Sequence, residues 1–288
     1  MVRRSYTVPL PDGRALALGE RTLVMGILNV TPDSFADGGL YLDPARAVDA
    51  GLEMIAAGAD LLDVGGESTR PGATPVAADE ERARILRVIA ALVKQTKTPV
   101  SVDTYKADVA AAALDAGAAI VNDVSGLAGD ERMAGVAARH HAALVLMHNR
   151  GRSRDMYARA QYAEVVREVA AELSASIAAA EADGVPRERI VVDPGIGFAK
   201  HAEDSLRLVA RLDDAVFAGL DRPILLGPSR KSFLTLALGD VPPDEREWGT
   251  AAAVTAGILA GAHIVRVHGV RAMAQVAKVA DALLAARQ

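Results

Sequence analysis

From about residue 23 to its end, the chain alternates short apolar segments with longer alanine-rich ones. Eight of the apolar segments have the length of a strand and are rich in Val, Ile and Leu: 23–30, 60–66, 99–104, 119–126, 143–149, 190–197, 223–229 and 263–269. In the segments between them, apolar residues recur at spacings of three and four, as in 43–59 and 105–118. This alternation predicts eight strands, each followed by an amphipathic helix.

Strands that are apolar on both faces and alternate with helices are typical of a parallel sheet. Eight such units in a chain of 288 residues predict an α/β fold of the (β/α)8 TIM-barrel class. A doubly wound open sheet is the alternative, but it would show fewer strands and a Gly-rich first turn. Asp12-Gly13 lies between two short extended runs and predicts a hairpin. We therefore expect one domain, 1–288, in which 1–23 form an N-terminal hairpin extension.

Helix ends and composition refine this prediction. Gly58, Gly117, Gly184 and Gly261 each follow a helical segment and are expected to end it. Hydrophobic residues make up 51% of the chain and aromatic residues only 3%, so the core must be aliphatic. The net charge of -5 argues against a general nucleic-acid or anionic-membrane surface. Without cysteine, a signal-like segment or a long uncharged run, the sequence predicts a soluble cytoplasmic protein.

Every predicted strand ends on a polar or ionisable residue. In chain order these residues are Asn29, Asp63, Asp103, Asn122, His148, Asp193, Ser229 and His268. Lys231 follows the seventh strand, and Arg266 lies within the eighth. One such residue alone is as well explained by a cap on the next loop, and a lone His148 is better explained by a local hydrogen bond. Eight at one mouth of a barrel favour a ligand.

The residue types predict what that ligand is. Asp103, Asn122 and Asp193 offer acceptors and an amide, which suit a flat heterocycle with several N–H groups. Lys231, Arg266 and His268 supply positive charge that suits phosphate oxygens, and Asn29 offers an oxygen to Mg²⁺. Pro194-Gly195 is expected to turn the chain away and leave Asp193 uncovered. The segments 29–39 and 65–76 look like polar loops that close over the site.

At this point the motifs resemble the dihydropteroate synthase family, the folate-pathway enzymes that sulfonamides inhibit. In order along the chain, the matching motifs are MGILNVTPDSFADGG, DVGGESTRPGA, SVDTYKADVAAAALDAGA, VNDVSG, VLMH, VDPGIGFAK, PSRKSFL and IVRVH. The resemblance implies a pterin-binding TIM barrel. It also implies a transferase that condenses 7,8-dihydropterin-6-ylmethyl pyrophosphate with 4-aminobenzoate to give 7,8-dihydropteroate and pyrophosphate.

The resemblance also implies roles for individual residues. The positions that match the family's pterin contacts are Asp103, Asn122, Met147, Asp193, Gly227 and Lys231. Those that match its pyrophosphate contacts are Asn29, Arg266 and His268, with Asn29 also holding Mg²⁺. Those that match the aminobenzoate pocket and its two loops are Asp33, Ser34, Phe35, Thr69, Arg70, Phe198, Ser229 and Arg230. The implied mechanism is dissociative, with Asp63, Asp103, Lys231, Arg266 and His268 as the catalytic set.

Two other functions share part of this pattern. A barrel that transfers a methyl group from methyltetrahydrofolate to a corrinoid protein would need the pterin contacts but not the diphosphate ligands Arg266 and His268. A non-catalytic pterin-binding relative would show a degraded set of polar positions, whereas here the set is intact. Members of the family are commonly homodimers, and the alanine-rich segment 248–263 could face either a partner or the protein's own core.

Overall fold

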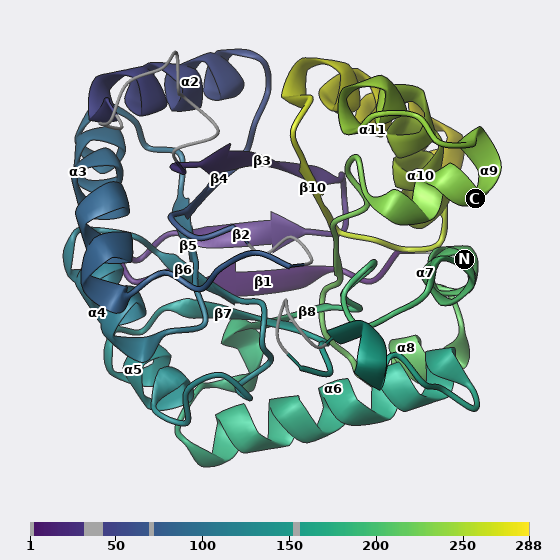
Figure 1. Cartoon of the computed structure of the whole chain (residues 1–288), viewed down its shortest axis with the longest axis horizontal. Helices are drawn as coiled ribbons and strands as arrows, with labels where there is room; N and C mark the ends of the chain where they lie inside the picture. Colours follow the sequence, from purple (N-terminus) through teal and green to yellow (C-terminus); the bar gives the residue numbers. More distant parts are fainter. Residues whose placement is uncertain (1–2, 32–42, 69–71, 152–155, 288) are drawn as a thin grey trace.

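The computed structural model describes residues 3–31, 43–68, 72–151 and 156–287 and contains the predicted barrel (Figure 1). Its parallel sheet has the strands β3 (Leu23–Asn29), β4 (Leu61–Gly65), β5 (Val100–Asp103), β6 (Ile120–Asp123), β7 (Ala143–Met147), β8 (Ile190–Asp193), β9 (Leu225–Leu226) and β10 (Ile264–Val267). Neighbours follow chain order from β3 to β8, and β10 lies between β3 and β9. A bridge between Val192 and Ile224 joins β8 to the start of β9 and closes the ring.

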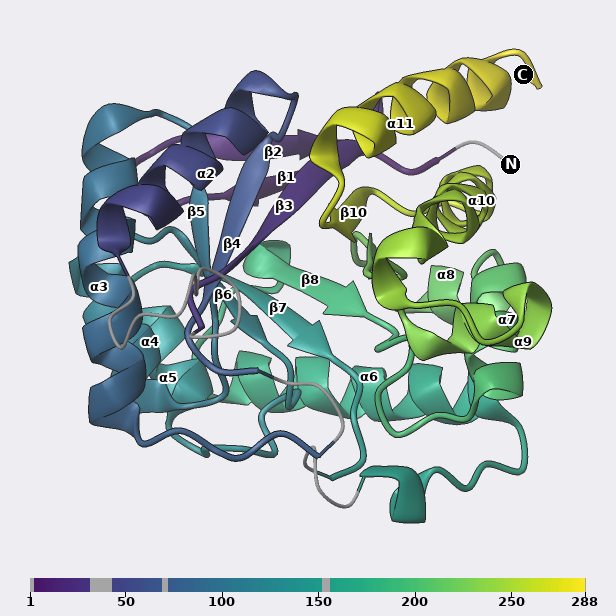
Figure 2. The same ribbon diagram turned by 45° about the horizontal axis from the view of Figure 1, so that its top comes forward.

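Helices surround the strands on the outside (Figures 1 and 2). They are α2 (Pro44–Ala56), α3 (Ala78–Gln95), α4 (Ala107–Asp115), α5 (Met133–Arg139), α6 (Val165–Ala182), α7 (Ala202–Ala210), α8 (Ala215–Gly219), α9 (Thr235–Leu238), α10 (Glu247–Leu259) and α11 (Val270–Ala285), with short 3-10 turns at Met156–Arg159, Arg187–Arg189, Ser232–Leu234 and Pro243–Arg246. The predicted terminators Gly58, Gly117, Gly184 and Gly261 all have positive φ, as a left-handed helix end requires. Within the described residues, no helix combines the length and apolarity needed to cross a membrane.

The N-terminal hairpin packs against the amino-terminal end of the barrel. Strands β1 (Tyr6–Pro9) and β2 (Ala15–Leu18) pair antiparallel, and Gly13 has a φ of 81° in the turn between them. The apolar side chains of the hairpin form one buried cluster with inward residues of the barrel strands, including Met25, Leu61 and Ile264. This cluster fills the barrel at that end, so chemistry has room only at the opposite, carboxyl end of the strands.

Alternation along each strand places the polar residues of the strand ends inside the barrel, where they form a ring that is called the polar ring below. Successive side chains of a strand point to opposite faces, so residues two apart share the barrel interior. Each of four strands has an apolar member of the inner cluster followed two residues later by a polar side chain: Leu61 and Asp63, Ile120 and Asn122, Val191 and Asp193, Ile264 and Arg266. The outer faces of the same strands pack against the helices in an aliphatic core, in which Phe217 and Phe233 are the aromatic members.

The packing of α10 against β9 can be tested at Gly257. Gly257 of α10 lies against Leu226 of β9, and a Cβ atom at Gly257 would come within 2.1 Å of Leu226 Cδ2. Leu226 is fully buried, so it cannot move aside without displacing its neighbours. We therefore expect Gly257→Ala to destabilise the protein by about 1–3 kcal/mol and to lower its Tm by thermal denaturation.

Gly219→Ala is the matched control, because nothing lies within 4 Å of a Cβ at that position. It should leave the Tm unchanged or raise it slightly, since alanine restricts the unfolded chain. If Gly257→Ala were as stable as Gly219→Ala, α10 would not pack closely on β9.

Candidate active site

Arg266 lies between two buried carboxylates at the centre of the polar ring. Its Nε donates to Asp63 Oδ2 at 2.6 Å, and its Nη2 donates to Asp103 Oδ2 at 2.6 Å. The side chain of Asp63 is fully buried, and that of Asp103 is 7% exposed. One guanidinium thus links β10 to β4 and β5 across the barrel interior, and among the described residues its Nη1 donors have no partner and can serve a ligand.

Asn122 completes this side of the ring and leaves its acceptors unused. Its Nδ2 donates to Asp63 Oδ2 at 2.9 Å. Within the described part of the chain, the buried oxygens Asp63 Oδ1, Asp103 Oδ1 and Asn122 Oδ1 have no hydrogen-bond partner. Because a buried acceptor without a donor costs stability, three of them in one place indicate a site built for a ligand that carries N–H groups.

Asp193 ends β8, and the turn that follows it forms a hydrogen bond with the Asp193 carboxylate. Gly195 has a φ of 68°, and its N–H donates to Asp193 Oδ1 at 2.7 Å. The prediction that Pro194-Gly195 leaves Asp193 uncovered was therefore wrong for one oxygen. The other oxygen, Oδ2, faces the space above Gly227, where a Cβ atom would come within 3.9 Å of it.

Gly227 keeps open the space in which three charged side chains meet. A Cβ atom there would lie 3.8 Å from Lys231 Nζ and 3.8 Å from the Cβ of Arg266, in addition to its contact with Asp193. Lys231 Nζ donates to the carbonyl oxygen of Ile196 at 2.6 Å and lies 4.5 Å from the centre of the Phe198 ring. The predicted residues Asp193, Phe198, Gly227 and Lys231 are thus brought together on one side of the ring.

Ser229 and His268 form a second polar pair between β9 and β10. The backbone N–H of His268 donates to Ser229 Oγ at 3.1 Å, and the same oxygen lies 3.0 Å from His268 Nδ1. Ser229 Oγ accepts the first bond, and its role toward Nδ1 follows the tautomer of His268. Arg230 turns the other way: its Nε donates to Glu247 Oε2 of α10 at 3.0 Å.

The remaining predicted residues divide into two groups. Met147 ends β7, is buried and pairs in register with Asp193, and Asn29 ends β3 and is partly exposed. Asp33, Ser34 and Phe35 of the first loop and Thr69 and Arg70 of the second lie outside the described residues. Among the residues that are described, no cluster of three or more His, Cys, Asp or Glu side chains could hold a metal by itself.

Burial shifts the pKa values of Asp103, Asp193 and Lys231 in the polar ring toward neutral pH. Burial raises the pKa of Asp103 to about 7, and the Asp63 carboxylate adds to this against the opposing charge of Arg266. Burial also raises the pKa of Asp193, although Lys231 and the Gly195 N–H oppose it. For Lys231, burial lowers the pKa to about 8 against the attraction of Asp193. Titratable groups shifted in this way in a cleft are typical of functional sites.

The charges of the ring indicate what it can stabilise. Asp63, Asp103 and Asp193 supply three carboxylates, against which Arg266 and Lys231 supply two cations. Carboxylates that are held in place by hydrogen bonds stabilise positive charge that develops on a bound molecule. The cationic side chains at the edge of the same site can hold an anionic group.

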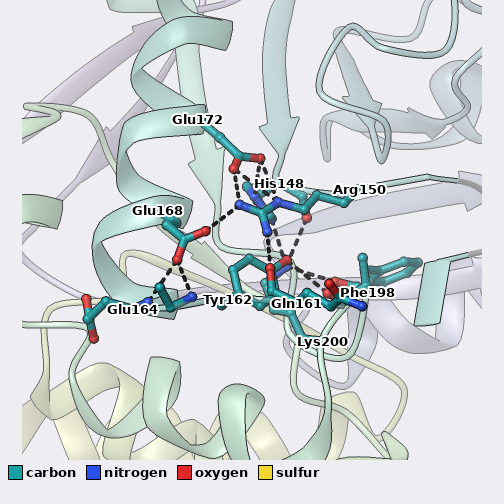
Figure 3. A network of polar contacts seen from close by, with 11 residues as sticks. His148, Arg150, Gln161, Tyr162, Glu164, Glu168, Glu172, Phe198 and Lys200 are labelled. Atoms are coloured by element: carbon teal, nitrogen blue, oxygen red, sulfur yellow. Dashed lines mark hydrogen bonds and ion pairs between the residues drawn. The ribbon is translucent and has the colours of Figure 1, made fainter. Parts of the chain in front are cut away.

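One part of the site was not recognised from the sequence. The sequence predicts His148 as one of eight polar strand ends, for which a local hydrogen bond is the better explanation when it is taken alone, and it predicts no role for Lys200. In the structure, Lys200 is buried beside His148, and both belong to a network that continues to Glu172 and Arg150 (Figure 3). Sequence shows Lys200 only as a lysine among small and apolar residues, and a lysine at that place is ordinarily exposed.

Comparison with known proteins identifies relatives that share this arrangement of the chain. Residues 25–268 match the family described as pterin binding enzyme. The dihydropteroate synthase of Bacillus subtilis is 48% identical over 270 residues, which are 94% of this chain and 91% of that protein.

Solved structures agree with the sequence relatives. Dihydropteroate synthase of Xanthomonas albilineans with 4-aminobenzoic acid has a TM-score of 0.89 at 41% identity, covering 98% of this chain and 99% of that one. The Burkholderia cenocepacia enzyme complexed with 7,8-dihydropteroate has a TM-score of 0.87 at 39% identity, covering 98% of each chain. The course of the chain is thus shared over nearly the full length, at sequence identities of 39% and 41%.

The titration of Asp103 predicts how the stability of the ligand-free protein depends on pH. Its pKa is about 7 when folded, against about 3.9 in an unfolded chain. A raised pKa favours the folded state below pH ~4, and this contribution is lost as pH rises through 7. Asp103→Asn removes the titration. The free energy of unfolding of the variant, relative to that of wild type, should therefore increase by about 1–3 kcal/mol when the pH rises from 5 to 8.

Thermal denaturation at the two pH values measures this gain. Asp79→Asn on α3 is the control, because that carboxylate is 88% exposed, and its effect on Tm should be the same at both pH values. A Tm difference for Asp103→Asn that does not change with pH would show that Asp103 ionises in the folded protein as it does in the unfolded one.

Proposed function

This chain belongs to the dihydropteroate synthases, within the family of pterin binding enzymes, and from that membership we propose how its site divides between two substrates. The chain is a transferase that condenses 7,8-dihydropterin-6-ylmethyl pyrophosphate with 4-aminobenzoate, giving 7,8-dihydropteroate and pyrophosphate. Both substrates are small molecules, and we place the reaction in the cytoplasm. The observation that carries the division is the set of unpartnered buried acceptors around Arg266.

The pterin ring binds, in this proposal, among Asp103, Asn122 and Asp193. Asp103 Oδ1 and Asn122 Oδ1 are buried acceptors without a partner in the described chain, and Asp193 presents Oδ2 to the same space. The amino-pyrimidine edge of a pterin carries adjacent N–H donors, which match a carboxylate that accepts two parallel hydrogen bonds. Met147 and Gly227 border the slot, and Lys231 supplies a donor to the pterin's carbonyl and ring nitrogens.

The diphosphate lies on the other side of Arg266. Arg266 uses Nε and one Nη2 hydrogen for the carboxylates, so its remaining donors can reach phosphate oxygens. His268 is held by Ser229 through its backbone N–H and its Nδ1, and Asn29 ends the neighbouring strand β3. These three residues form an anion subsite across β3 and β10.

Mg²⁺ fits this subsite as an ion that would be bound partly by the protein and partly by the diphosphate. The described residues contain no self-sufficient cluster of metal ligands, but Asn29 offers one amide oxygen, and Mg²⁺ usually takes few protein ligands beside phosphate and water. When bound, Mg²⁺ would neutralise charge on the leaving diphosphate.

Aminobenzoate is assigned to the side of the site where Phe198, Ser229 and Arg230 lie. The Phe198 ring is placed by its contact with Lys231, and Arg230 has a φ of 58° with its guanidinium shared with Glu247. Phe35, Thr69 and Arg70 are assigned to the same substrate by family position, as parts of the two loops.

The chemistry that these residues support is a dissociative displacement. The bond between the pterin methylene and the diphosphate oxygen breaks first, and positive charge spreads over the methylene and the pterin ring. Asp63 and Asp103 are fixed in place by Arg266 and stabilise that charge electrostatically. The aryl amine then forms the new C–N bond and releases one proton, and its orientation in the pocket supplies much of the rate.

We also propose that the protein works as a homodimer joined through α10 and α11. These two helices pack side by side (Figure 2). On the outer face of α10, Trp248 is 85% exposed and shares a stripe with the exposed Ala252 and Ala256, at intervals of four residues. On α11, Val279 is 61% and Leu283 50% exposed. The segment 248–263 thus packs one face inward and presents a second apolar face, which a partner can cover.

Turnover tests the proposed function directly. Wild type incubated with dihydropterin pyrophosphate, labelled 4-aminobenzoate and Mg²⁺ should form labelled dihydropteroate, and chelation of the metal should suppress the product. Asp193→Asn should weaken the binding of a pterin analogue by roughly 10- to 100-fold, because an amide places donors against the donors of the pterin. Calorimetry measures the affinity, and Asp79→Asn serves again as the control.

Three outcomes would contradict parts of the assignment. Binding of the pterin analogue without turnover would favour a non-catalytic pterin-binding protein, and methyl transfer from methyltetrahydrofolate to a corrinoid protein would favour the methyltransferase. If Asp193→Asn kept the wild-type affinity, Asp193 would not be the acceptor for the pterin.

The dimer has a separate test. Ala252→Glu adds a charge to the centre of the α10 stripe, so its mass by light scattering should fall toward the protomer value of 30.0 kDa, while wild type has twice that mass. Ala178→Glu, on the exposed face of α6, should leave the mass unchanged. A monomeric wild type, or a dimer that tolerates Ala252→Glu, would remove α10 from the interface.

A further inference from the structure

Lys200 is a buried cation that does not face either substrate subsite. It lies at the end of the segment after β8 and is only 2% exposed. Its Nζ donates to the carbonyl oxygen of Phe198 at 2.8 Å and to that of His148 at 3.3 Å, and it lies 2.8 Å from His148 Nδ1 (Figure 3). A lysine is seldom buried unless its charge and its three donors are all matched.

The proton positions in this network follow from Glu172. Hydrogen bonds from His148 and Arg150 lower the pKa of Glu172 to about 2, so the carboxylate is ionised and can only accept. It lies 3.0 Å from His148 Nε2, which must therefore carry a hydrogen. Burial, together with the charge of Lys200, lowers the pKa of His148 to about 4, so the ring is neutral and Nδ1 is an acceptor. Burial lowers the pKa of Lys200 well below its usual value, against the attraction of Asp193. In its protonated form, Lys200 has three donors that match three acceptors: the carbonyl oxygens of Phe198 and His148, and His148 Nδ1.

The same bonds connect Lys200 to the pterin side of the site. The backbone N–H of His148 donates to the carbonyl oxygen of Asp193 at 2.8 Å. The His148 carbonyl oxygen lies over Gly195, where a Cβ atom would come within 2.0 Å of it. Phe198, whose carbonyl Lys200 holds, places its ring beside Lys231. Lys200 therefore joins the end of β7 to the turn that carries both Asp193 and Phe198.

A second set of contacts anchors this network on α6. Arg150 pairs with Glu172 and, at 2.8 Å, with Glu168, and its guanidinium lies 4.0 Å from the centre of the Tyr162 ring. Tyr162 donates its hydroxyl hydrogen to the carbonyl of Ala199, a non-glycine residue with a φ of 48°. The bonds from Tyr162 to the Ala199 carbonyl and from Lys200 to the Phe198 carbonyl thus hold a segment that contains a strained backbone conformation.

We propose that Lys200 is a positioning residue for the pterin end of the site. As an ammonium, it donates to the carbonyl oxygens of His148 and Phe198. Its third hydrogen bonds to Nδ1 of His148, whose Nε2 in turn donates to Glu172. Its role is to hold the Asp193 carboxylate and the Phe198 ring at the distance that substrate binding needs. This inference rests on the function proposed above, because it takes Asp193 and Phe198 as substrate contacts. Small displacements of such groups are enough to reduce binding and turnover strongly.

Lys200→Met keeps the length of the side chain and removes its charge and donors. We expect the Kd of a pterin analogue to rise by on the order of 10-fold and kcat/KM for the dihydropterin substrate to fall at least as much. KM for aminobenzoate should rise less, because only Phe198 connects Lys200 to that pocket. Lys94→Met, at an exposed lysine of α3, is the matched control and should change none of these values.

A spectroscopic measurement on the wild-type protein does not depend on the stability of the variant. The ¹⁵N shifts of His148 at neutral pH should show a neutral ring with its hydrogen on Nε2, and Lys200→Met should lose the hydrogen bond to Nδ1. A protonated Nδ1 in wild type, or an unchanged Kd in a folded Lys200→Met, would overturn the proposal. Absence of turnover in wild type would instead contradict the proposed function, while pterin-analogue binding and the His148 spectrum would still test the role of Lys200.

Discussion

The contact of Arg266 with Asp63 and Asp103 is the interaction on which the carboxyl end of the barrel depends. It connects three strands across the interior, at a level where apolar side chains no longer fill the space. Without the guanidinium, two carboxylates would be buried close together with no cation between them, at a cost of several kcal/mol. With it, both are oriented and each still has one oxygen to offer. The same contact therefore supports the fold and prepares the site.

The incomplete pairing of this ring has a consequence for stability. Among the residues that the structure describes, buried acceptors at Asp63, Asp103 and Asn122 have no donor, and the Asp103 carboxyl group has a pKa near neutrality because burial disfavours its charge. A protein selected for stability alone would bury apolar groups there. A bound heterocycle with N–H groups supplies the missing donors, so binding adds stability at the place where the empty protein lacks it.

Around Asp193 the support is built from backbone carbonyls and two lysines. Lys231 donates to the Ile196 carbonyl from the substrate side, and Lys200 donates to the Phe198 carbonyl from the interior. Between them the chain follows several left-handed conformations, including that of Gly195, which only a tightly bonded turn maintains. The two sides of the site are thus held differently: one by an ion pair across the barrel, the other by a turn fastened to β7 and α6.

The sequence by itself determined the barrel and the composition of its polar ring, because alternation and spacing are local properties that each strand carries independently. It also indicated that Asp193 ends a buried strand before a Pro-Gly turn. Only the tertiary structure decided that Arg266, assigned from sequence to an anion, also lies between Asp63 and Asp103, and that Lys200 is buried against His148. Those contacts join residues from 52 to 203 positions apart, and such pairings form only when the barrel closes and brings separate strands together.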